Sequence, residues 1–450
     1  MLWLLEPETT TETAIDTGSV ITEPSTLVES QATEVLTGAN FVDWRDSLEC
    51  RCLLVTASPG SGKSVLSNFV TGHLEERTTG SKSEKVIYYF CNIRVPLSER
   101  TAEAVVRALI IQLCQDQDSL IRLLPPRFEK DSNAFLKAPL GELWGIFGSM
   151  MQRSPLSHMY CVIDGLDVYG SCMVELVHKL LAIFGTSELE LPMSRKLLCT
   201  SRPEPGIMKS WGGNLERQLR PNGSDLRKYV DSRLANLEDF NYSMREAARA
   251  MIVKDFENPR LSYQVGSTFL LISIAIRKLE QMSFPTVAKI RAEIKDSSRN
   301  LDDLFEDMIV AVSERTPANA VILAWVVYAE QPLTLDQLQE ATAVEPSRVY
   351  ETYDQLDETR PQLTEPSVRR ELGVLLDIVE GRVFVIHQSV QDFVKRTKLL
   401  ERWVSPAPRT FVGECCMRYL ILCLAESQGC VETSGKVSLD LNDREDSCEV

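Results

Sequence analysis

A short apolar run leads directly into a glycine-rich turn at residues 53–64, Leu-Leu-Val-Thr-Ala-Ser-Pro-Gly-Ser-Gly-Lys-Ser. The run predicts a buried strand over 53–56, and the apolar pattern that follows the turn predicts a helix over 63–77. A strand, a glycine-rich turn and a helix in this order form the Walker A arrangement. In it, backbone N–H groups and the helix N-terminus converge on phosphate. The segment therefore predicts a phosphate site at the end of a strand.

Each position of this turn has a chemical task. The glycines Gly60 and Gly62 let the backbone curl, Lys63 places a cation on the β- and γ-phosphates, and Ser64 offers a hydroxyl to Mg²⁺. Ala57 stands where the motif has its first glycine, which costs little if its backbone angles are ordinary. The residues predicted to contact nucleotide are Ala57, Ser58, Pro59, Gly60, Ser61, Gly62, Lys63, Ser64 and Val65.

A second apolar strand ends in a carboxylate about a hundred residues downstream, at Tyr-Cys-Val-Ile-Asp, residues 160–164. This is the pattern of a Walker B strand, whose final acid holds Mg²⁺ directly or through water. Asp164 is therefore predicted as a metal-binding residue together with Ser64. Gly165 leaves space beside the phosphates, and Asp167 adds a second carboxylate that is predicted to orient the attacking water.

A third buried strand delivers an arginine to the same edge, at Leu-Leu-Cys-Thr-Ser-Arg-Pro, residues 197–203. A guanidinium pairs bidentately with phosphate oxygens, so Arg202 is predicted to report the γ-phosphate. The chain has no Asn-Lys-x-Asp motif for reading guanine. By default this favours adenine, and the expected ligands are ATP and ADP with Mg²⁺.

Strand patterns alternate with helical patterns between residues 51 and 205. Helical stretches of ten or more residues between strands imply crossover connections and a mainly parallel sheet covered on both faces. This predicts an α/β domain with a doubly wound parallel sheet of the P-loop NTPase kind. The expected strands cover 53–56, 85–91, 159–164 and 196–200, and the expected helices 63–77, 101–115 and 173–184.

Strand signals fade after Arg202, and helical patterns dominate as far as residue 329. Further on, two short helices precede strands at 374–379 and 382–386, joined by a turn at Glu380-Gly381, in the order of a winged helix. The predicted domains are a disordered acidic leader at 1–35, a nucleotide-binding domain at 36–205, a helical domain at 206–315, a winged-helix domain at 316–400, and a C-terminal helix with a polar tail at 401–450.

The charge balance narrows the range of partners. A net charge of −16 repels polyphosphate backbones, which argues against non-specific nucleic-acid binding as the main activity. No run approaches the roughly 18 apolar residues of a membrane helix, so we predict no membrane span and a cytoplasmic location. Pairs such as Cys50 and Cys52 are open to a redox or zinc interpretation, but no Cys-x-x-Cys spacing occurs and idle thiols are favoured.

With these pieces in order, residues 36–425 resemble the NACHT branch of the STAND nucleotide-switch ATPases, particularly the fungal nephrocystin-3-like N-terminal type. The most specific marks are Ser-Pro-Gly-Ser-Gly-Lys-Ser at 58–64, Asp-Gly-Leu-Asp at 164–167 and Thr-Ser-Arg-Pro at 200–203. Later marks are Trp-Val-Val-Tyr-Ala-Glu-Gln-Pro-Leu-Thr at 325–334 and Phe-Val-Ile-His-Gln-Ser-Val-Gln-Asp-Phe at 384–393.

The resemblance implies a module that folds over ADP at rest and opens toward oligomerisation when ATP replaces it. By the same resemblance, His387 of the winged helix contacts the bound diphosphate in the closed state; the alternative is a histidine satisfied at a strand end. The family commonly has an acidic residue directly after Asp167, where this chain has Val168. Slow hydrolysis, or binding without hydrolysis, is therefore expected.

Family members usually carry an effector domain before the switch and repeats after it, and neither is evident in this sequence. Truncation, an incomplete gene model and a switch that works through another subunit are the alternatives. Three functions remain in competition: a nucleotide-gated switch with protein partners or self-oligomers, a true NTPase with turnover, and a degenerate scaffold.

Overall fold

The computed structural model describes residues 39–433, apart from 48, 116, 186–192, 213–214, 219–222, 257–267, 298–299 and 351. The predicted leader at 1–35 and the polar tail from 434 onward lie outside the described residues. The chain divides into two compact units. One contains the residues up to Ile276 and 284–298, and the other contains 277–283 and the residues from 299 onward.

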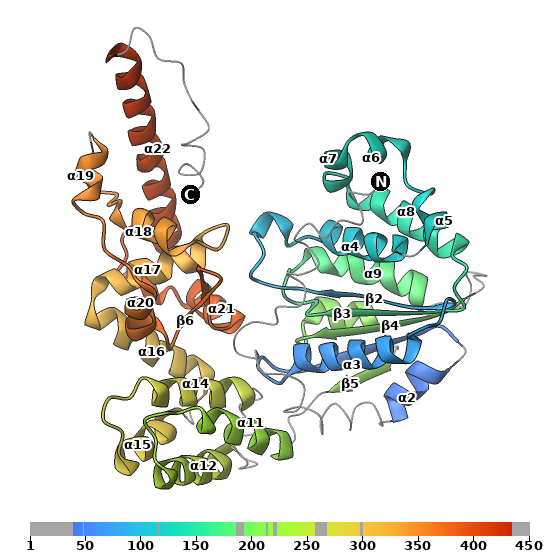
Figure 1. Ribbon diagram of the computed structural model, residues 1–450, viewed down its shortest axis with the longest axis horizontal. Helices are drawn as coiled ribbons and strands as arrows, with labels where there is room; N and C mark the ends of the chain where they lie inside the picture. Colours follow the sequence, from blue (N-terminus) through green and yellow to red (C-terminus); the bar gives the residue numbers. More distant parts are fainter. Residues whose placement is uncertain are drawn as a thin grey trace. The chain divides into compact units, whose positions relative to one another are not determined.

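A five-stranded sheet forms the centre of the first unit, in the order β2-β3-β4-β1-β5 (Figure 1). All four neighbouring pairs are parallel, so the carboxyl ends of the strands meet at one edge. The strand β4 lies between the strand that precedes the Walker A turn and the strand that ends in Asp164. The strands are β1 (Arg51–Thr56), β2 (Glu84–Phe90), β3 (His158–Asp164), β4 (Ser194–Ser201) and β5 (Leu215–Gln218).

Helices cover both faces of this sheet, with α4 and α9 on one face and α3 on the other (Figure 1). Alternate side chains of β1 divide between two apolar cores: Leu54 packs with the first face and Leu53 with the second. This confirms the predicted doubly wound α/β fold. The described helices of the first unit up to residue 211 are α2 (Ala39–Asp46), α3 (Lys63–Thr78), η2 (Leu97–Glu99), α4 (Ala102–Cys114), α5 (Asp118–Ile121), α6 (Pro126–Lys130), α7 (Ser132–Leu136), α8 (Leu140–Arg153), α9 (Cys172–Phe184) and α10 (Pro205–Trp211).

The short helix α2 is part of this core. Trp44 is fully buried, and its indole Nε1 donates a hydrogen bond to the carbonyl oxygen of Leu197 at 3.0 Å. Phe41 stacks obliquely on the same indole ring at 5.2 Å between centroids. Trp44 therefore packs in the apolar core of this unit.

The edge strand β5 was not expected from the sequence. Strand signals were predicted to end at Arg202, but β5 adds a parallel edge strand beyond it. Only four residues long, with the sequence Leu-Glu-Arg-Gln, β5 lacks the apolar run that identifies a buried strand. The helices of the first unit beyond β5 are α11 (Gly223–Ala235), α12 (Tyr242–Phe256) and α15 (Val287–Ser297), together with the first part of α14 (Thr268–Glu280).

The second unit is mainly helical and contains one antiparallel hairpin, β6 (Leu376–Val379) with β7 (Arg382–Val385). Both residues of its turn have positive φ, 51° at Glu380 and 76° at Gly381, as a two-residue type I′ turn requires. The predicted turn is confirmed. The remaining elements are α16 (Leu301–Arg315), α17 (Pro317–Tyr328), α18 (Leu335–Ala343), α19 (Tyr353–Asp357), α20 (Glu365–Leu372), α21 (Gln388–Thr397), η3 (Leu399–Arg402) and α22 (Pro408–Thr433).

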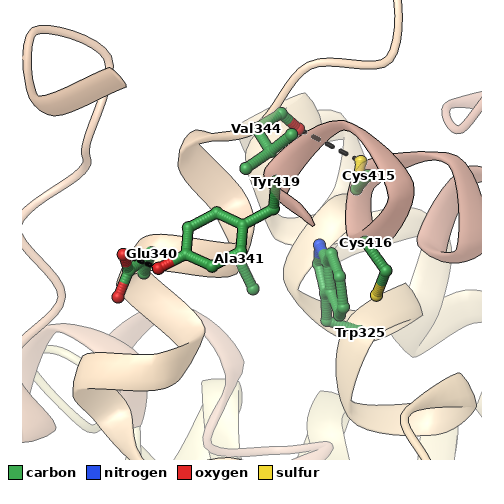
Figure 2. A pocket seen from close by; sticks show the side chains of 7 residues that line it. All are labelled: Trp325, Glu340, Ala341, Val344, Cys415, Cys416 and Tyr419. Atoms are coloured by element: carbon green, nitrogen blue, oxygen red, sulfur yellow. Dashed lines mark hydrogen bonds between the residues drawn. The ribbon is translucent and has the colours of Figure 1, made fainter. Parts of the chain in front are cut away.

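A small pocket lies where α17, α18 and α22 pack together. Figure 2 shows the hydroxyl of Tyr419 directed at Glu340, to which it donates at 2.5 Å, and the thiol of Cys415 against the carbonyl oxygen of Val344. These contacts fasten α22 to α18 within the second unit. Among the described residues, no helix combines the length and apolar character needed to cross a membrane.

No disulfide joins cysteines within the described part of the chain. Cys52 is buried in β1, and burial raises the pKa of its thiol to about 12. A thiol with so high a pKa stays protonated and unreactive at neutral pH. The structure thus shows Cys52 as a buried free thiol, in line with the favoured interpretation.

Candidate functional site

The turn between β1 and α3 has the geometry of a phosphate cradle. Gly60 and Gly62 have φ of 69° and 87°, in the left-handed region that favours glycine. Gly60 also has no room for a side chain, because a Cβ atom there would lie 2.3 Å from the Cβ of Leu270. Gly62 is the N-cap of α3 and makes no side-chain cap, so the cap residue itself does not satisfy the first N–H groups of the helix.

Lys63 folds back over the turn that precedes it. Its Nζ donates to the carbonyl oxygens of Ala57 and Ser58 at 2.9 and 3.1 Å. Ala57, in place of the first glycine, is not among the residues with positive φ, and its N–H donates to the carbonyl oxygen of Ser201 at 3.1 Å. Alanine therefore fits this position without strain, as the sequence predicted.

Asp164 lies at the end of β3, only 2% exposed, and accepts hydrogen bonds from three hydroxyl groups. Ser64 Oγ donates to its Oδ2 at 2.6 Å, which brings the two predicted metal-binding residues together. Ser67 Oγ and Thr200 Oγ1 donate to its Oδ1 at 2.7 and 2.5 Å. The carboxylate is thus oriented by α3 and β4 at once.

The roles of Ser67 and Thr200 were missed in the sequence. Ser67 is three residues after Ser64 and so lies on the same face of α3. Thr200 was noted only as part of a motif, and its position opposite Asp164 depends on the register of β3 and β4, in which Ile163 lies opposite Cys199. The role of Ser67 could have been predicted from its spacing along the helix. The role of Thr200 could be recognised only once the order of the strands was known.

Thr200→Val should lower the free energy of unfolding by about 1–3 kcal/mol, the cost of leaving buried polar groups unsatisfied. The hydroxyl both donates to Asp164 and accepts the N–H of Gly165 at 2.9 Å, so an isosteric methyl removes two hydrogen bonds. Thr200→Ser keeps the hydroxyl and is the matched control. Urea-induced unfolding measures both, and equal losses in the two variants would contradict this account of the hydroxyl.

Asp167 and Arg202 form an ion pair beside this carboxylate. Arg202 Nε lies 3.0 Å from Asp167 Oδ2, and the backbone N–H of Arg202 donates to Asp167 Oδ1 at 2.8 Å. The two residues follow β3 and β4, which are neighbours in the sheet. Their proximity is a consequence of strand order that the sequence did not reveal.

The charges at this edge influence one another. Burial lowers the pKa of Lys63 below its ordinary value, while the negative charges of Asp167 and Asp164 act in the opposite direction. The positive charge of Arg202 lowers it further. Two carboxylates and two cations therefore share a small region at the carboxyl edge of the sheet, where α/β folds bind their ligands.

Val168 occupies the position where an acidic residue was expected from the family resemblance. Its N–H donates to the carbonyl oxygen of Gly165 at 2.9 Å, and its side chain packs beside that glycine. A Cβ atom on Gly165 would lie 2.9 Å from Val168 Cγ2. An apolar group fills this space, so the position supplies no carboxylate.

His387 belongs to the second unit, where it is the N-cap of α21. Its Nδ1 accepts the backbone N–H of Ser389 at 3.1 Å, which requires the proton of a neutral ring to sit on Nε2. This is the helix-capping arrangement, close to the alternative of a histidine satisfied at a strand end. Contact with a diphosphate remains a prediction.

The strand order, the cradle after β1 and the paired Ser64 and Asp164 define a P-loop NTPase fold. Residues 31–202 match the family model described as Nephrocystin 3, N-terminal, and residues 305–401 match the GPI inositol-deacylase winged helix domain. These matches support a NACHT-like P-loop NTPase of the STAND class, with a nucleotide-binding part similar to the nephrocystin-3 N-terminal family followed by a part similar to that winged helix.

Known proteins that are similar include the vegetative incompatibility protein HET-E-1 of Podospora anserina. It is 26% identical over 377 residues, which cover 81% of this chain and 26% of that protein. This chain thus spans about a quarter of the length of that relative. Among solved structures, the Aeropyrum pernix ORC1 protein in complex with DNA is 15% identical, with 89% of this chain and 98% of that chain covered and a TM-score of 0.37. Cdc6p from Pyrobaculum aerophilum is 12% identical, with 87% and 98% covered and a TM-score of 0.35.

Proposed function

We propose that this chain is a nucleotide-responsive switch that binds ATP and ADP with Mg²⁺ at the turn between β1 and α3. The observation that carries the proposal is the pairing of Ser64 with Asp164 at 2.6 Å beside a lysine folded over a glycine-rich cradle. Hydroxyl and carboxylate oxygens are the ligands that Mg²⁺ prefers. The donor set therefore fits a magnesium ion held by Ser64 and Asp164.

The phosphates are bound by the N–H groups of the turn and the N-terminus of α3, with Lys63 as the cation. When bound, Mg²⁺ supplies positive charge that neutralises the phosphate oxygens. The residues assigned to nucleotide are those of the cradle, residues 57–65, together with Arg202 near the γ-phosphate. Adenine is favoured because no guanine-reading motif is present.

We propose that the main role of this site is to distinguish bound ATP from bound ADP, and that hydrolysis of ATP is secondary. Val168 supports slow hydrolysis, because its side chain fills the space beside Gly165 with an apolar group. A ligand shifts a two-state equilibrium only by its differential affinity for the two states. Contacts of Lys63 and Arg202 with a γ-phosphate provide such a difference between ATP and ADP. By family resemblance, ATP then favours opening of the domains and oligomerisation, with His387 contacting the diphosphate in the closed state.

Binding and hydrolysis measured on the same purified protein test this function. We expect saturable binding of radiolabelled ATP and ADP, with phosphate release below about 0.1 s⁻¹, slower than the roughly 1–100 s⁻¹ of kinases. Rapid release would support an NTPase with turnover instead. Binding of neither nucleotide would support a degenerate scaffold and contradict the proposal.

The affinity for ATP should fall as pH rises through the alkaline range. Because burial lowers the pKa of Lys63, the free protein loses this proton at a pH below 10.5, the ordinary lysine value. Phosphate stabilises the protonated form, so above the pKa of the free protein binding must take up a proton and weakens up to about tenfold per pH unit. Fluorescent-nucleotide titrations across this range measure the slope. The same slope in Lys63→Ala would contradict the assignment to Lys63.

A further inference from the structure

Both oxygens of the Asp167 carboxylate are bound by a single residue, Arg202. One accepts the backbone N–H of Arg202 at 2.8 Å, and the other faces its Nε at 3.0 Å. The side chain of Asp167 is only 5% exposed and that of Arg202 only 19%. Both groups are thus largely shielded from water, where an ion pair is screened less than on the surface.

This double contact fixes the direction of the guanidinium. A guanidinium is planar, so a bond from Nε sets the plane in which both Nη groups lie. The backbone bond holds the start of the same side chain against the same carboxylate. Asp167 thereby fixes the orientation of the Arg202 guanidinium at the edge of the sheet that also carries Lys63 and Asp164.

The effect of Asp167 on the pKa of Lys63 also places this carboxylate close to the cations of the site. Among the charged groups that act on the pKa of Lys63, Asp167 has the largest effect, and it opposes the influence of Arg202. Asp167 therefore lies within electrostatic reach of both cations. Two positive groups facing the same phosphate site repel each other, and a carboxylate near both reduces this repulsion before the nucleotide arrives.

We propose that Asp167 is a positioning residue that anchors Arg202 for the γ-phosphate, so that the pair sets the preference of the site for ATP over ADP. The role differs from the water-orienting role expected from the sequence. It rests on the proposed nucleotide-binding function. ADP has no γ-phosphate, so its affinity does not depend on the anchor.

The affinities of Asp167→Asn for ATP and ADP, measured by calorimetric titration in Mg²⁺, test the proposal. In Asp167→Asn, the oxygen of the side-chain amide accepts from one of the two N–H groups of Arg202. The amide NH₂ group then faces the other N–H group and cannot accept a hydrogen bond from it. We expect the affinity for ATP to fall about tenfold, as for the loss of one hydrogen bond to a charged group, while the affinity for ADP is unchanged. Retained ADP binding also shows that the variant is folded.

A double-mutant cycle separates anchoring from an independent role. Arg202→Ala should lower ATP affinity at least as much as Asp167→Asn, and the double variant should show no further loss. The matched control is Asp231→Asn, which breaks an ion pair with Arg249 on the surface of the same unit and should leave both affinities unchanged.

Two results would overturn the proposal. Slower phosphate release in Asp167→Asn with an unchanged ratio of ADP to ATP affinity would restore the water-orienting role. Additive losses in the double variant would show that Asp167 and Arg202 act separately. If the wild-type protein bound neither nucleotide, the proposed function would fall together with this inference, whereas the first two results would leave nucleotide binding intact.

Discussion

Replacing Lys63 by alanine is expected to weaken the binding of both ATP and ADP by about 100-fold or more. The ammonium is the cation of the cradle, and hydrogen bonds between charged groups contribute about 1.5–3 kcal/mol each. Both nucleotides lose affinity because Lys63 contacts the β-phosphate as well as the γ-phosphate. Equilibrium dialysis with radiolabelled nucleotide measures the two dissociation constants.

The fold should survive this substitution. Among the residues that the structure describes, Lys63 donates to two carbonyl oxygens of its own turn, those of Ala57 and Ser58. Lys179→Ala is the matched control, because Lys179 is a lysine of the same unit that pairs with Glu175 on α9. It should bind both nucleotides like the wild type. Equal binding by Lys63→Ala and Lys179→Ala would remove Lys63 from the site.

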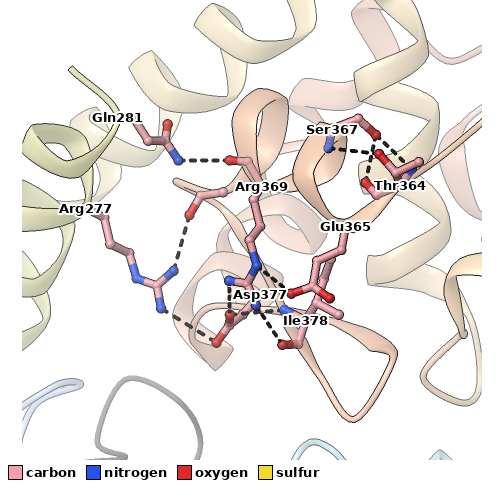
Figure 3. A network of polar contacts seen from close by, with 9 residues as sticks. Arg277, Gln281, Thr364, Glu365, Ser367, Arg369, Asp377 and Ile378 are labelled. Carbon is pink, nitrogen blue, oxygen red and sulfur yellow. Dashed lines mark hydrogen bonds and ion pairs between the residues drawn. The ribbon is translucent and has the colours of Figure 1, made fainter. Parts of the chain in front are cut away.

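The second large expected effect is a loss of stability caused by a substitution in the second unit. Asp377→Ala should lower the free energy of unfolding by about 3–5 kcal/mol, because it leaves a buried arginine without its partner. Asp377 lies on β6 with a side chain 5% exposed, and its Oδ2 is 3.7 Å from an Nη of Arg277, itself 11% exposed. Figure 3 shows Arg277 and Arg369 directed at this carboxylate from two sides.

Further contacts fix the same region. Arg277 donates to the carbonyl oxygen of Gly373 at 3.3 Å, and Gln281 donates to that of Arg369 at 3.2 Å. Gly373 has no space for a Cβ atom, which would lie 2.6 Å from Nε2 of Gln281. The end of α14 is therefore held against α20 and the hairpin by these backbone contacts together with the ion pair between Arg277 and Asp377.

Urea-induced unfolding tests this prediction against an exposed ion pair of the same unit. Asp302→Ala removes the partner of Arg396, where both side chains are more than half exposed, and should cost less than about 1 kcal/mol. Replacing both buried partners, with Arg277→Met and Asp377→Leu, should recover much of the loss. A cost for Asp377→Ala no greater than that for Asp302→Ala would contradict the account.

The parts of the fold that the sequence predicted are those with strong local signals. The strand and turn around Lys63, the strand ending in Asp164 and the hairpin turn at Glu380-Gly381 all carry apolar runs or turn residues at short range. The helix α8 was missed although Leu143, Ile146, Phe147 and Met150 repeat at helical spacing, so its signal was present and unused. The edge strand β5 had no comparable signal.

The site was predicted as a set of residues but not as a set of contacts. The sequence identified Ser64, Asp164 and Arg202 from motifs, and the structure brings Ser64 onto Asp164. The binding of Asp167 to Arg202 and of Thr200 to Asp164 depends on β3 and β4 being neighbours. Strand order is set by long-range packing of two apolar faces, which no short motif encodes.

The cradle between β1 and α3 is proposed to bind a nucleoside triphosphate together with Mg²⁺. Equilibrium dialysis of the wild-type chain with radiolabelled ATP, in Mg²⁺ and in EDTA, tests this binding most directly. We predict one saturable site per chain, with tighter binding in Mg²⁺ than in EDTA. The absence of saturable ATP binding in Mg²⁺ would contradict the account.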